Sequence, residues 1–218
     1  MKNKTIWSNR FENKTSLSFQ KIGSSVHIDK RLYEQDIAAS IVHTQMLSKQ
    51  KIISSKDGAK IINGLKKIKS LIDKGNFEFK DKFEDIHLNV EKKLFEIIGP
   101  SAGFLHTARS RNDQVVTDFK LWIKNASKEI LKDITLVMKN IIKKAEKNTD
   151  TVMPGLTHLK NAQPISFAHY LLSYYEMLKR DKNRFENNIK LLDECPLGSA
   201  ALSGCLLYTS DAADETGR

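Results

Sequence analysis

Apolar residues recur every three or four positions along most of the chain, and this spacing is typical of amphipathic helices. It predicts five helices, over about residues 30–49, 54–74, 85–98, 113–148 and 164–193. Three stretches lack the spacing and are expected to be irregular: 1–30, 101–112 and 149–163. Nowhere does the alternation of apolar and polar residues that marks a half-buried strand compete with it. The pattern therefore predicts an all-α protein.

Each of the three shorter helices has an apolar face. In the first, one side is expected to hold Ile37, Ala38, Ile41 and Val42. The second opens on a capping box, in which Ser54 and Asp57 satisfy free backbone N–H groups, and Gly75 suits its end. Its expected stripe is Ile61, Leu65, Ile68 and Ile72. The buried row expected in the third is Val90, Leu94 and Ile97, and Gly99-Pro100 ends it.

The two longest helices carry narrow apolar seams. The first seam is Phe119, Ile123, Ala126, Ile130, Ile134, Val137 or Met138, Ile141 and Ala145. The second is Leu171, Tyr175, Leu178, Phe185, Ile189 and Leu192, in a helix expected to open on Pro164. Two such seams cannot close a core by themselves. We therefore expect members of an extended bundle that further helices or other subunits complete.

Charge and composition narrow the class of protein. The 218 residues carry a formal net charge of +10. Because the lysines are spread over helix faces, most are expected to be solvated, and some to attract an anionic substrate. A basic helical protein that binds nucleic acid is an alternative that rests on this charge alone.

Cysteines and apolar runs point to a cellular location. The two cysteines, Cys195 and Cys205, provide no disulfide framework. The N-terminus lacks the apolar run of a signal peptide, and no stretch is apolar enough to span a bilayer. We therefore expect a cytoplasmic protein without membrane contact.

The stretch from Gly103 to Gln114 gathers polar side chains before an expected helix start. Arg109, Ser110, Arg111 and Asn112 follow one another there. Arginine forks match carboxylates, and a helix N-terminus adds N–H groups and a positive dipole end. The stretch therefore suits a dicarboxylate. A capped loop, in which Asn112 or Asp113 simply starts the helix, explains the same residues equally well.

Two other segments hold candidate chemistry. His158, between Thr157 and Leu159 and close to Lys160, could move protons near neutral pH, although a lone histidine is more often structural. Asp85 and His87 open the third expected helix, where a helix cap is the simpler interpretation.

Taken together, these segments resemble argininosuccinate lyases, a family of the fumarase/aspartase superfamily. The similar segments are EDIHLNVEKKLFEIIG, GFLHTARSRNDQVVTDFKLWIK, PGLTHLKNAQPISFAHYLLSYYEML and PLGSAALSG, in the family's order and spacing. The opening Trp7-Ser8-Asn9-Arg10-Phe11 is similar to the family's Trp-Gly-Gly-Arg-Phe, with both glycines replaced. The resemblance covers nearly all of residues 5–204.

The resemblance implies a fold and an assembly. It implies an N-terminal helical domain over residues 1–112, followed over 113–204 by the first long helices of the superfamily's central helical bundle, truncated. Family members continue for roughly as long again, and that part carries the catalytic serine loop. They are homotetramers in which each site is built from three subunits, and they need no metal or organic cofactor. This chain alone is therefore expected to be inactive and poorly folded beyond its N-terminal half.

The resemblance also implies a reaction, the β-elimination of argininosuccinate to arginine and fumarate in arginine biosynthesis. It gives His158 the catalytic role of supplying a proton to the departing nitrogen. The substrate-binding residues that it implies are Ser25, Arg111, Asn112 and Thr157, whose donors suit a doubly charged carboxylate. The supporting residues are Asp85, His87, Arg109, Ser110 and Gln163.

Other members of the superfamily are the alternatives. Adenylosuccinate lyase, fumarase and aspartase share the helical core and the elimination chemistry, and some crystallins use the scaffold as non-enzymatic structural proteins. The run from Ser110 to Gln114 and the Thr157-His158 pair fit the argininosuccinate branch better.

The last residues differ in character from the rest. Residues 205–218 share nothing with the family and resemble an in-frame translation of a sequencing-library adapter. We expect them to be a non-native tail.

Overall fold

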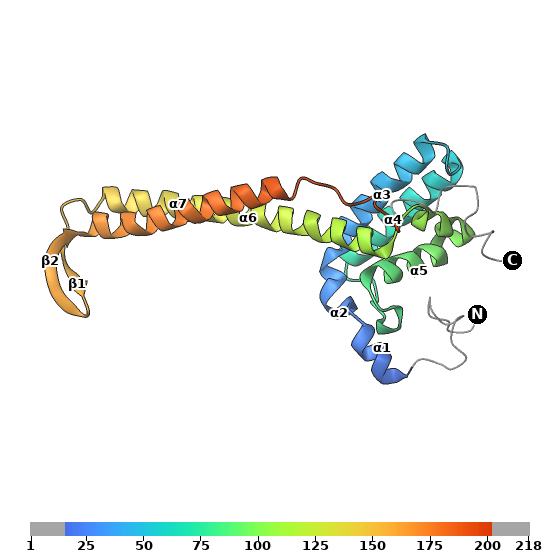
Figure 1. The fold of residues 1–218 in the computed structure, drawn as a ribbon, viewed down its shortest axis with the longest axis horizontal. Coiled ribbons are helices and arrows are strands. Elements are labelled where there is room, and N and C mark those ends of the chain that lie inside the picture. The colour runs from blue at the N-terminus through green and yellow to red at the C-terminus, as the bar shows by residue number, and fades with distance from the viewer. Residues whose placement is uncertain (1–15, 202–218) are drawn as a thin grey trace. The chain divides into compact units, whose positions relative to one another are not determined.

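Helices make up most of residues 16–201, the part of the chain that the computed structural model describes (Figure 1). The prediction of an all-α fold is confirmed, with one two-stranded hairpin as an addition. None of these helices is long and apolar enough to cross a bilayer. The Trp7–Phe11 segment and the predicted foreign tail lie outside the described residues.

The chain forms two compact units. The first comprises the chain up to Phe119 together with the segment from Pro196, and the second comprises Lys120–Cys195. The described elements of the first unit, before the long helix that leaves it, are α1 (Leu17–Gly23), α2 (Val26–Asp29), η1 (Lys30–Leu32), α3 (Tyr33–Lys49), α4 (Ser55–Asp73), η2 (Asp81–Phe83), α5 (Ile86–Ile98) and η3 (Gly99–His106). The second unit holds most of α6 (Arg111–Glu146), then β1 (Val152–Thr157), β2 (Lys160–Ser166) and α7 (Phe167–Leu191).

Helices α3, α4 and α5 enclose the apolar core of the first unit. Ser54 caps α4 by accepting a hydrogen bond from the Asp57 N–H at 3.0 Å, and Gly75 follows its end at φ +71°, so both predicted ends are confirmed. The core residues are Ile37, Leu47, Ile53, Ile61, Leu65, Ile68, Ile86, Val90, Leu94, Ala102 and Leu105. A Cβ at Gly64 would lie 2.4 Å from Leu94 Cδ1, so the missing side chain lets α4 and α5 pack closely.

The inner face of α3 is more polar than predicted. Ile37 is buried, but Ala38 and Val42 are exposed. The interior side is instead formed by Gln35, Asp36, Ile37, Ser40, His43, Thr44 and Leu47. The apolar spacing was misleading because several of these polar side chains have hydrogen-bond partners inside the unit, which removes most of the penalty for burying them.

Two short helices occupy most of residues 17–29, contrary to prediction. Helix α1 starts where the Ser16 hydroxyl accepts the Phe19 N–H at 3.2 Å, and α2 follows after two residues. Both are too short to show a repeating apolar stripe. Phe19 and Ile22 are exposed, so the apolar residues of α1 do not mark a buried face in the sequence.

Helices α6 and α7 run antiparallel in the second unit. The Lys124 ammonium near the start of this part of α6 contacts Asp193, just after the end of α7. Figure 1 shows the two helices side by side over this length. All six residues of the predicted α7 seam are half-buried, and Met138 and Ala145 of the α6 seam are buried. Phe119 and Ile130 are exposed, because a single neighbouring helix covers only part of so long a stripe.

The segment between these helices is a β-hairpin, not the irregular stretch that was predicted. Strands β1 and β2 pair antiparallel, with Val152 opposite Ser166 and Thr157 opposite Lys160. Pro164, expected to open α7, lies in β2 opposite Pro154, and Ser166 caps the helix instead. Proline argues against a strand in general, but a two-stranded ribbon consists only of edges, where a missing N–H is tolerated.

The turn of the hairpin explains why its sequence signal is weak. His158 and Leu159 have φ values of +50° and +63°, which suit a two-residue turn with both residues left-handed. Such turns favour Asn-Gly or Asp-Gly, and neither dipeptide is present at this turn. At Gly155, where the register is irregular, a Cβ would lie 2.6 Å from the Gln163 carbonyl oxygen, so glycine is needed there.

Replacing Leu159 by glycine should stabilise the hairpin. The side chain is 95% exposed, so no packing is lost, and a left-handed leucine costs about 1 kcal/mol. We expect slower amide hydrogen exchange across β1 and β2 in Leu159→Gly. Leu159→Ala is the matched control, since alanine keeps the backbone cost and should leave exchange unchanged. Equal exchange in the two variants would contradict this account.

Candidate functional site

A tight turn before α5 positions the first predicted site residue. The Phe83 carbonyl accepts the Asp85 N–H at 2.7 Å, with Glu84 between them at φ +63° and ψ −62°. This is a γ-turn, a strained conformation for a residue with a side chain. It leaves Asp85 as the N-cap of α5, where Asp85 Oδ1 accepts the Leu88 N–H at 2.6 Å.

Ser25 is tied to the same point. The Glu84 carbonyl accepts the backbone N–H groups of Ser25 at 2.8 Å and Val26 at 3.0 Å. The Ser25 hydroxyl donates to Asp29 Oδ2 at 2.6 Å, and Asp29 Oδ1 accepts the Ile86 N–H at 3.0 Å. Two predicted site residues far apart in sequence, Ser25 and Asp85, therefore meet at the start of α5.

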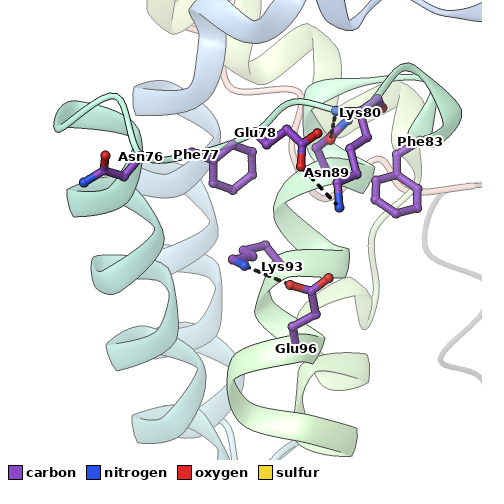
Figure 2. Close-up of a pocket in the computed structure, with 8 residues that line it drawn as sticks. All are labelled: Asn76, Phe77, Glu78, Lys80, Phe83, Asn89, Lys93 and Glu96. Carbon is purple, nitrogen blue, oxygen red and sulfur yellow. Dashed lines mark hydrogen bonds and ion pairs between the residues drawn. The ribbon is translucent and has the colours of Figure 1, made fainter.

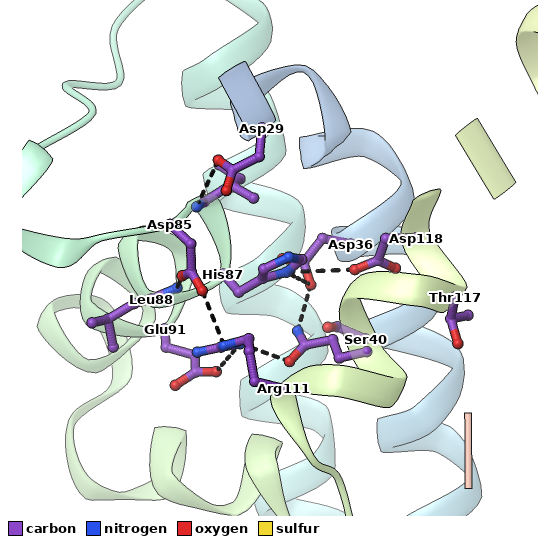
Figure 3. Close-up of polar contacts among 12 residues, drawn as sticks. Asp29, Asp36, Ser40, Asp85, His87, Leu88, Glu91, Arg111, Thr117 and Asp118 are labelled. Carbon is purple, nitrogen blue, oxygen red and sulfur yellow. Dashed lines mark hydrogen bonds and ion pairs between the residues drawn. The ribbon is translucent and has the colours of Figure 1, made fainter. Parts of the chain in front are cut away.

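Arg111 joins this group from the first turn of α6 (Figure 3). Its Nε lies 3.2 Å from Asp85 Oδ2, and its Nη1 lies 3.1 Å from Glu91 Oε1 and donates to Gln114 Oε1 at 2.7 Å. Burial raises the pKa of Asp85 against the opposing Arg111 charge. Burial alone would also raise the pKa of Glu91, but His106 and Arg111 outweigh it and hold that pKa below its usual value.

Ser110 and Asp113 begin α6. The Ser110 hydroxyl accepts the Asn112 N–H at 3.3 Å, and Asp113 Oδ1 accepts the Ser110 N–H at 3.0 Å. The other Asp113 oxygen accepts the N–H groups of Gly198 at 3.1 Å and Ala200 at 2.7 Å. One buried carboxylate thus joins two of the segments that carry the family resemblance. Asn112 is exposed at the second position of the helix, which starts two residues earlier than predicted.

Gln114 connects Arg111 to a buried polar cluster from three helices, which is formed by Asp36 of α3, His87 of α5, and Gln114 and Asp118 of α6. Figure 3 labels Asp36, His87 and Asp118 of this cluster. Asp36 Oδ1 lies 3.0 Å from His87 Nδ1 and accepts from Gln114 Nε2 at 2.7 Å. Asp118 Oδ2 lies 3.4 Å from the same His87 nitrogen. Within residues 16–201 neither Asp118 oxygen has a hydrogen-bond partner, and nor does His87 Nε2.

The pKa values of Asp36, His87 and Asp118 depend on one another, because the three side chains lie close together in the interior. Burial alone would raise the pKa of Asp36, but His87, Arg109 and the Gln114 donor outweigh it and hold that pKa low. Burial alone would lower the pKa of His87, but the two aspartates hold it above its usual value. Burial and the Asp36 carboxylate raise the pKa of Asp118 to about 8, against the charges of His87 and Arg109. A protonated Asp118 could donate to Asp36, which accounts for its lack of a protein donor.

The same cluster is the group of described residues whose geometry could hold a metal ion. One ligand atom each from Asp36, His87 and Asp118 lies within 4.8 Å of the others. However, Asp36 already accepts a Gln114 N–H, and the Arg109 guanidinium adds positive charge beside the aspartates. These N–H donors suit a cluster that is satisfied by protons better than one that awaits a cation.

Arg109 differs from Arg111 in its surroundings. It is only 3% exposed, and it donates from Nη1 to Ser40 Oγ at 3.0 Å and from Nη2 to the Leu105 carbonyl at 2.9 Å. It therefore fixes the loop before α6 against α3 from the interior. Whether it also supports substrate binding remains a prediction.

The remaining predicted site residues belong to the second unit. His158 occupies the exposed turn of the hairpin, Thr157 ends β1, and Gln163 lies exposed in β2. Their catalytic, binding and supporting roles likewise remain predictions.

A surface pocket of about 230 Å³ elsewhere in the first unit contains no predicted site residue (Figure 2). Its lining residues are Asn76, Phe77, Glu78, Lys80, Phe83, Asn89, Lys93 and Glu96. Several of its polar groups pair with one another, as Lys93 does with Glu96 at 2.9 Å. The pocket therefore offers no unsatisfied charge to a ligand.

Sequence reasoning assigned no role to Asp29, Asp36, Glu91, Gln114 and Asp118. A signal for two of them exists in hindsight: Asp113, Gln114, Thr117 and Asp118 recur on one helical face directly after the arginine stretch. Polar residues at helical spacing beside a binding motif indicate a buried network. No comparable local signal marks Asp36.

Comparison with known proteins assigns the chain to a family. The family model described as Lyase matches residues 9–215. The chain belongs to the Lyase family. The match extends into residues 205–215, the region predicted to be foreign.

Named relatives of this lyase chain are argininosuccinate lyases. That of Pelagibacter ubique is 57% identical over 202 residues, which is 93% of this chain and 44% of the relative. That of Ehrlichia ruminantium is 47% identical over 199 residues, covering 91% of this chain and 43% of the relative. The chain thus spans less than half the length of these curated relatives.

Solved structures of related lyases share the fold. An EDDS lyase variant with bound fumarate matches 88% of this chain and 38% of its own, with a TM-score of 0.72 and 26% identity. A fumarate lyase:delta crystallin from Brucella melitensis bound to cobalt matches 88% of this chain and 44% of its own, with a TM-score of 0.67 and 15% identity, which supports the fold alone.

The raised pKa of Asp118 makes stability depend on pH. The pKa of Asp118 is about 8 in the folded chain and about 4 in the unfolded chain. Between about pH 4 and pH 8 the folded chain therefore holds a proton on Asp118 that the unfolded chain has lost. The stabilisation that this proton provides is fully present below the unfolded pKa and is lost as pH rises through about 8. We expect urea unfolding of the 218-residue chain, followed by circular dichroism, to show a free energy of unfolding that falls from pH 6 to 8.5.

Asp118→Asn should lessen that slope, to which the raised pKa of His87 also contributes, and should be about 2 kcal/mol more stable than the parent at pH 8.5, since asparagine needs no proton. Asp133→Asn, at an exposed position of α6, is the matched control and should keep the parent slope. An unchanged slope in Asp118→Asn would show that Asp118 does not hold the proton.

Proposed function

We propose that the protein to which this chain belongs is an argininosuccinate lyase, which eliminates fumarate from argininosuccinate and releases arginine. The observation that carries the proposal is the Arg111 guanidinium, held at the start of α6 in a chain that is 57% identical over 202 residues to the argininosuccinate lyase of Pelagibacter ubique. We further propose that it acts in arginine biosynthesis, in the cytoplasm, as a homotetramer without a cofactor, nucleic acid or membrane.

Arg111 and Asn112 are suited to bind a carboxylate of the substrate. Within residues 16–201 the contacts of Arg111 engage Nε and Nη1, which leaves Nη2 for a ligand, and the side chain is a quarter exposed. Asn112 is exposed beside it, at a helix N-terminus whose dipole favours negative charge. Ser25 and Thr157 would add hydroxyl donors.

The elimination requires the site to stabilise the negative charge that develops as the substrate becomes a carbanion. Removal of a proton next to a carboxylate places additional negative charge on that group, and fixed donors such as Arg111 and Asn112 lower the energy of this state. His158 would supply the proton that the departing guanidino nitrogen takes up. Because its imidazole is exposed on a hairpin turn, its partners would come from the assembled enzyme.

Activity can be tested in a completed subunit, made by joining residues 1–204 to the remaining C-terminal part of the Pelagibacter ubique relative. We expect this completed enzyme to release arginine and fumarate in equal amounts. Arg111→Lys should lower kcat/KM about 100-fold, because lysine cannot reproduce the forked contacts. His158→Gln should lower kcat about 100-fold or more, which is the usual loss of a general acid or base.

Two matched controls separate chemistry from folding. Arg184→Lys and His169→Gln alter exposed residues of α7 and should leave the rates within about twofold. Adenylosuccinate, fumarate with water, and aspartate are assayed in parallel. Preference for any of them over argininosuccinate, or no turnover at all, would refute the proposed function.

A further inference from the structure

The side chain of Gln114 links two charged groups. It is 2% exposed, its Oε1 accepts from Arg111 Nη1 at 2.7 Å, and its Nε2 donates to Asp36 Oδ1 at 2.7 Å. Chemistry fixes which end of the amide faces which neighbour. A guanidinium can only donate and an ionised carboxylate can only accept, so the reverse orientation would lose both hydrogen bonds.

We propose that Gln114 is a positioning residue that ties the Arg111 guanidinium to the buried Asp36 carboxylate and thereby holds Arg111 ready for the carboxylate of the substrate. The last step of this inference rests on the proposed function. The link between the three side chains does not depend on it.

The other contacts of Arg111 explain why a third anchor matters. Asp85 and Glu91 both belong to α5 or its N-cap, so they attract the guanidinium toward a single helix. Gln114 lies three residues after Arg111 on α6 and is anchored through Asp36 to α3. With Gln114 in place, the orientation of the guanidinium is fixed by three helices. Without it, Nη1 would be held by Glu91 alone.

The first test uses the full 218-residue chain and needs no activity. We expect the Arg111 Nε–H in the parent to exchange slowly with water in nuclear magnetic resonance spectra. Gln114→Met has a similar size and no amide, and it should speed this exchange about tenfold, since it removes one charged hydrogen bond. Gln35→Met is the matched control: Gln35 is also buried, on α3, but its Oε1 has no partner within residues 16–201.

The second test uses the completed enzyme. Gln114→Met should raise KM for argininosuccinate about tenfold and change kcat less, because the substrate-holding group is displaced while the proton-transferring group is intact. Gln35→Met should leave both constants within about twofold. Equal effects of the two variants on exchange and on KM would overturn the proposal, because they would reflect a general loss of packing.

In Gln114→Glu, the pH dependence of KM distinguishes a positioning role of Gln114 from a purely structural one. Glutamate can still accept from Arg111, but it faces Asp36 with a second carboxylate, so the pair must share a proton. We expect KM of Gln114→Glu to approach the parent value near pH 6 and to rise more steeply than the parent value toward pH 8.5. A pH profile parallel to that of the parent would contradict the link to Asp36.

Other charged groups face this position in both the parent and the variant. They are Asp36 of α3, Asp85, His87 and Glu91 of α5 and its N-cap, His106 and Arg109 before α6, and Arg111 and Asp118 of α6. The comparison with the parent therefore isolates the carboxyl group introduced at position 114. If the completed enzyme has no activity but Gln114→Met alone speeds Arg111 exchange, the proposed function fails and the positioning link stands.

Discussion

The buried Asp36 carboxylate is the constraint on which the first unit depends. An ionised carboxylate without donors would cost several kcal/mol inside a protein. Its donors come from His87 on α5 and Gln114 on α6, while Asp36 itself lies on α3. The three helices must therefore meet in one register for the charge to be satisfied. An apolar core alone would tolerate other registers, because apolar contacts are not directional.

Helix starts connect this core to the candidate site. Asp85 caps α5 with one oxygen and contacts Arg111 with the other, so the residue that begins the helix also orients the guanidinium. Asp113 similarly serves the cap of α6 and the segment around Gly198. Because each carboxylate has two oxygens, local helix formation and the placement of distant segments use the same side chain. Folding of these helices and assembly of the site are thus coupled.

Sequence pattern predicted the helices well where burial is apolar and periodic, as in α4 and α7. It failed where other physics decides the structure. The face of α3 is set by polar partners such as Asp36 and His43, whose contacts are distant in sequence. The hairpin contains proline in both strands and lacks a glycine turn. The chemistry of their local stretches made Arg111 and His158 candidates, and the family resemblance assigned their roles. The role of Gln114 escaped notice because its anchor, Asp36, is distant in sequence.

Backbone strain occurs at or beside three predicted site residues, and also elsewhere, as at Lys51. Glu84, Ala108 and His158 all have positive φ without being glycine, and they adjoin or are the predicted residues Asp85, Arg109 and His158. Each such residue costs of order 1 kcal/mol or more and persists only where its surroundings fix it. At Glu84 the two N–H groups of Ser25 and Val26 supply that fixation. A relaxed turn there would move Asp85 away from the start of α5, so the strain is the local cost of presenting Ser25, Asp85 and Arg111 together.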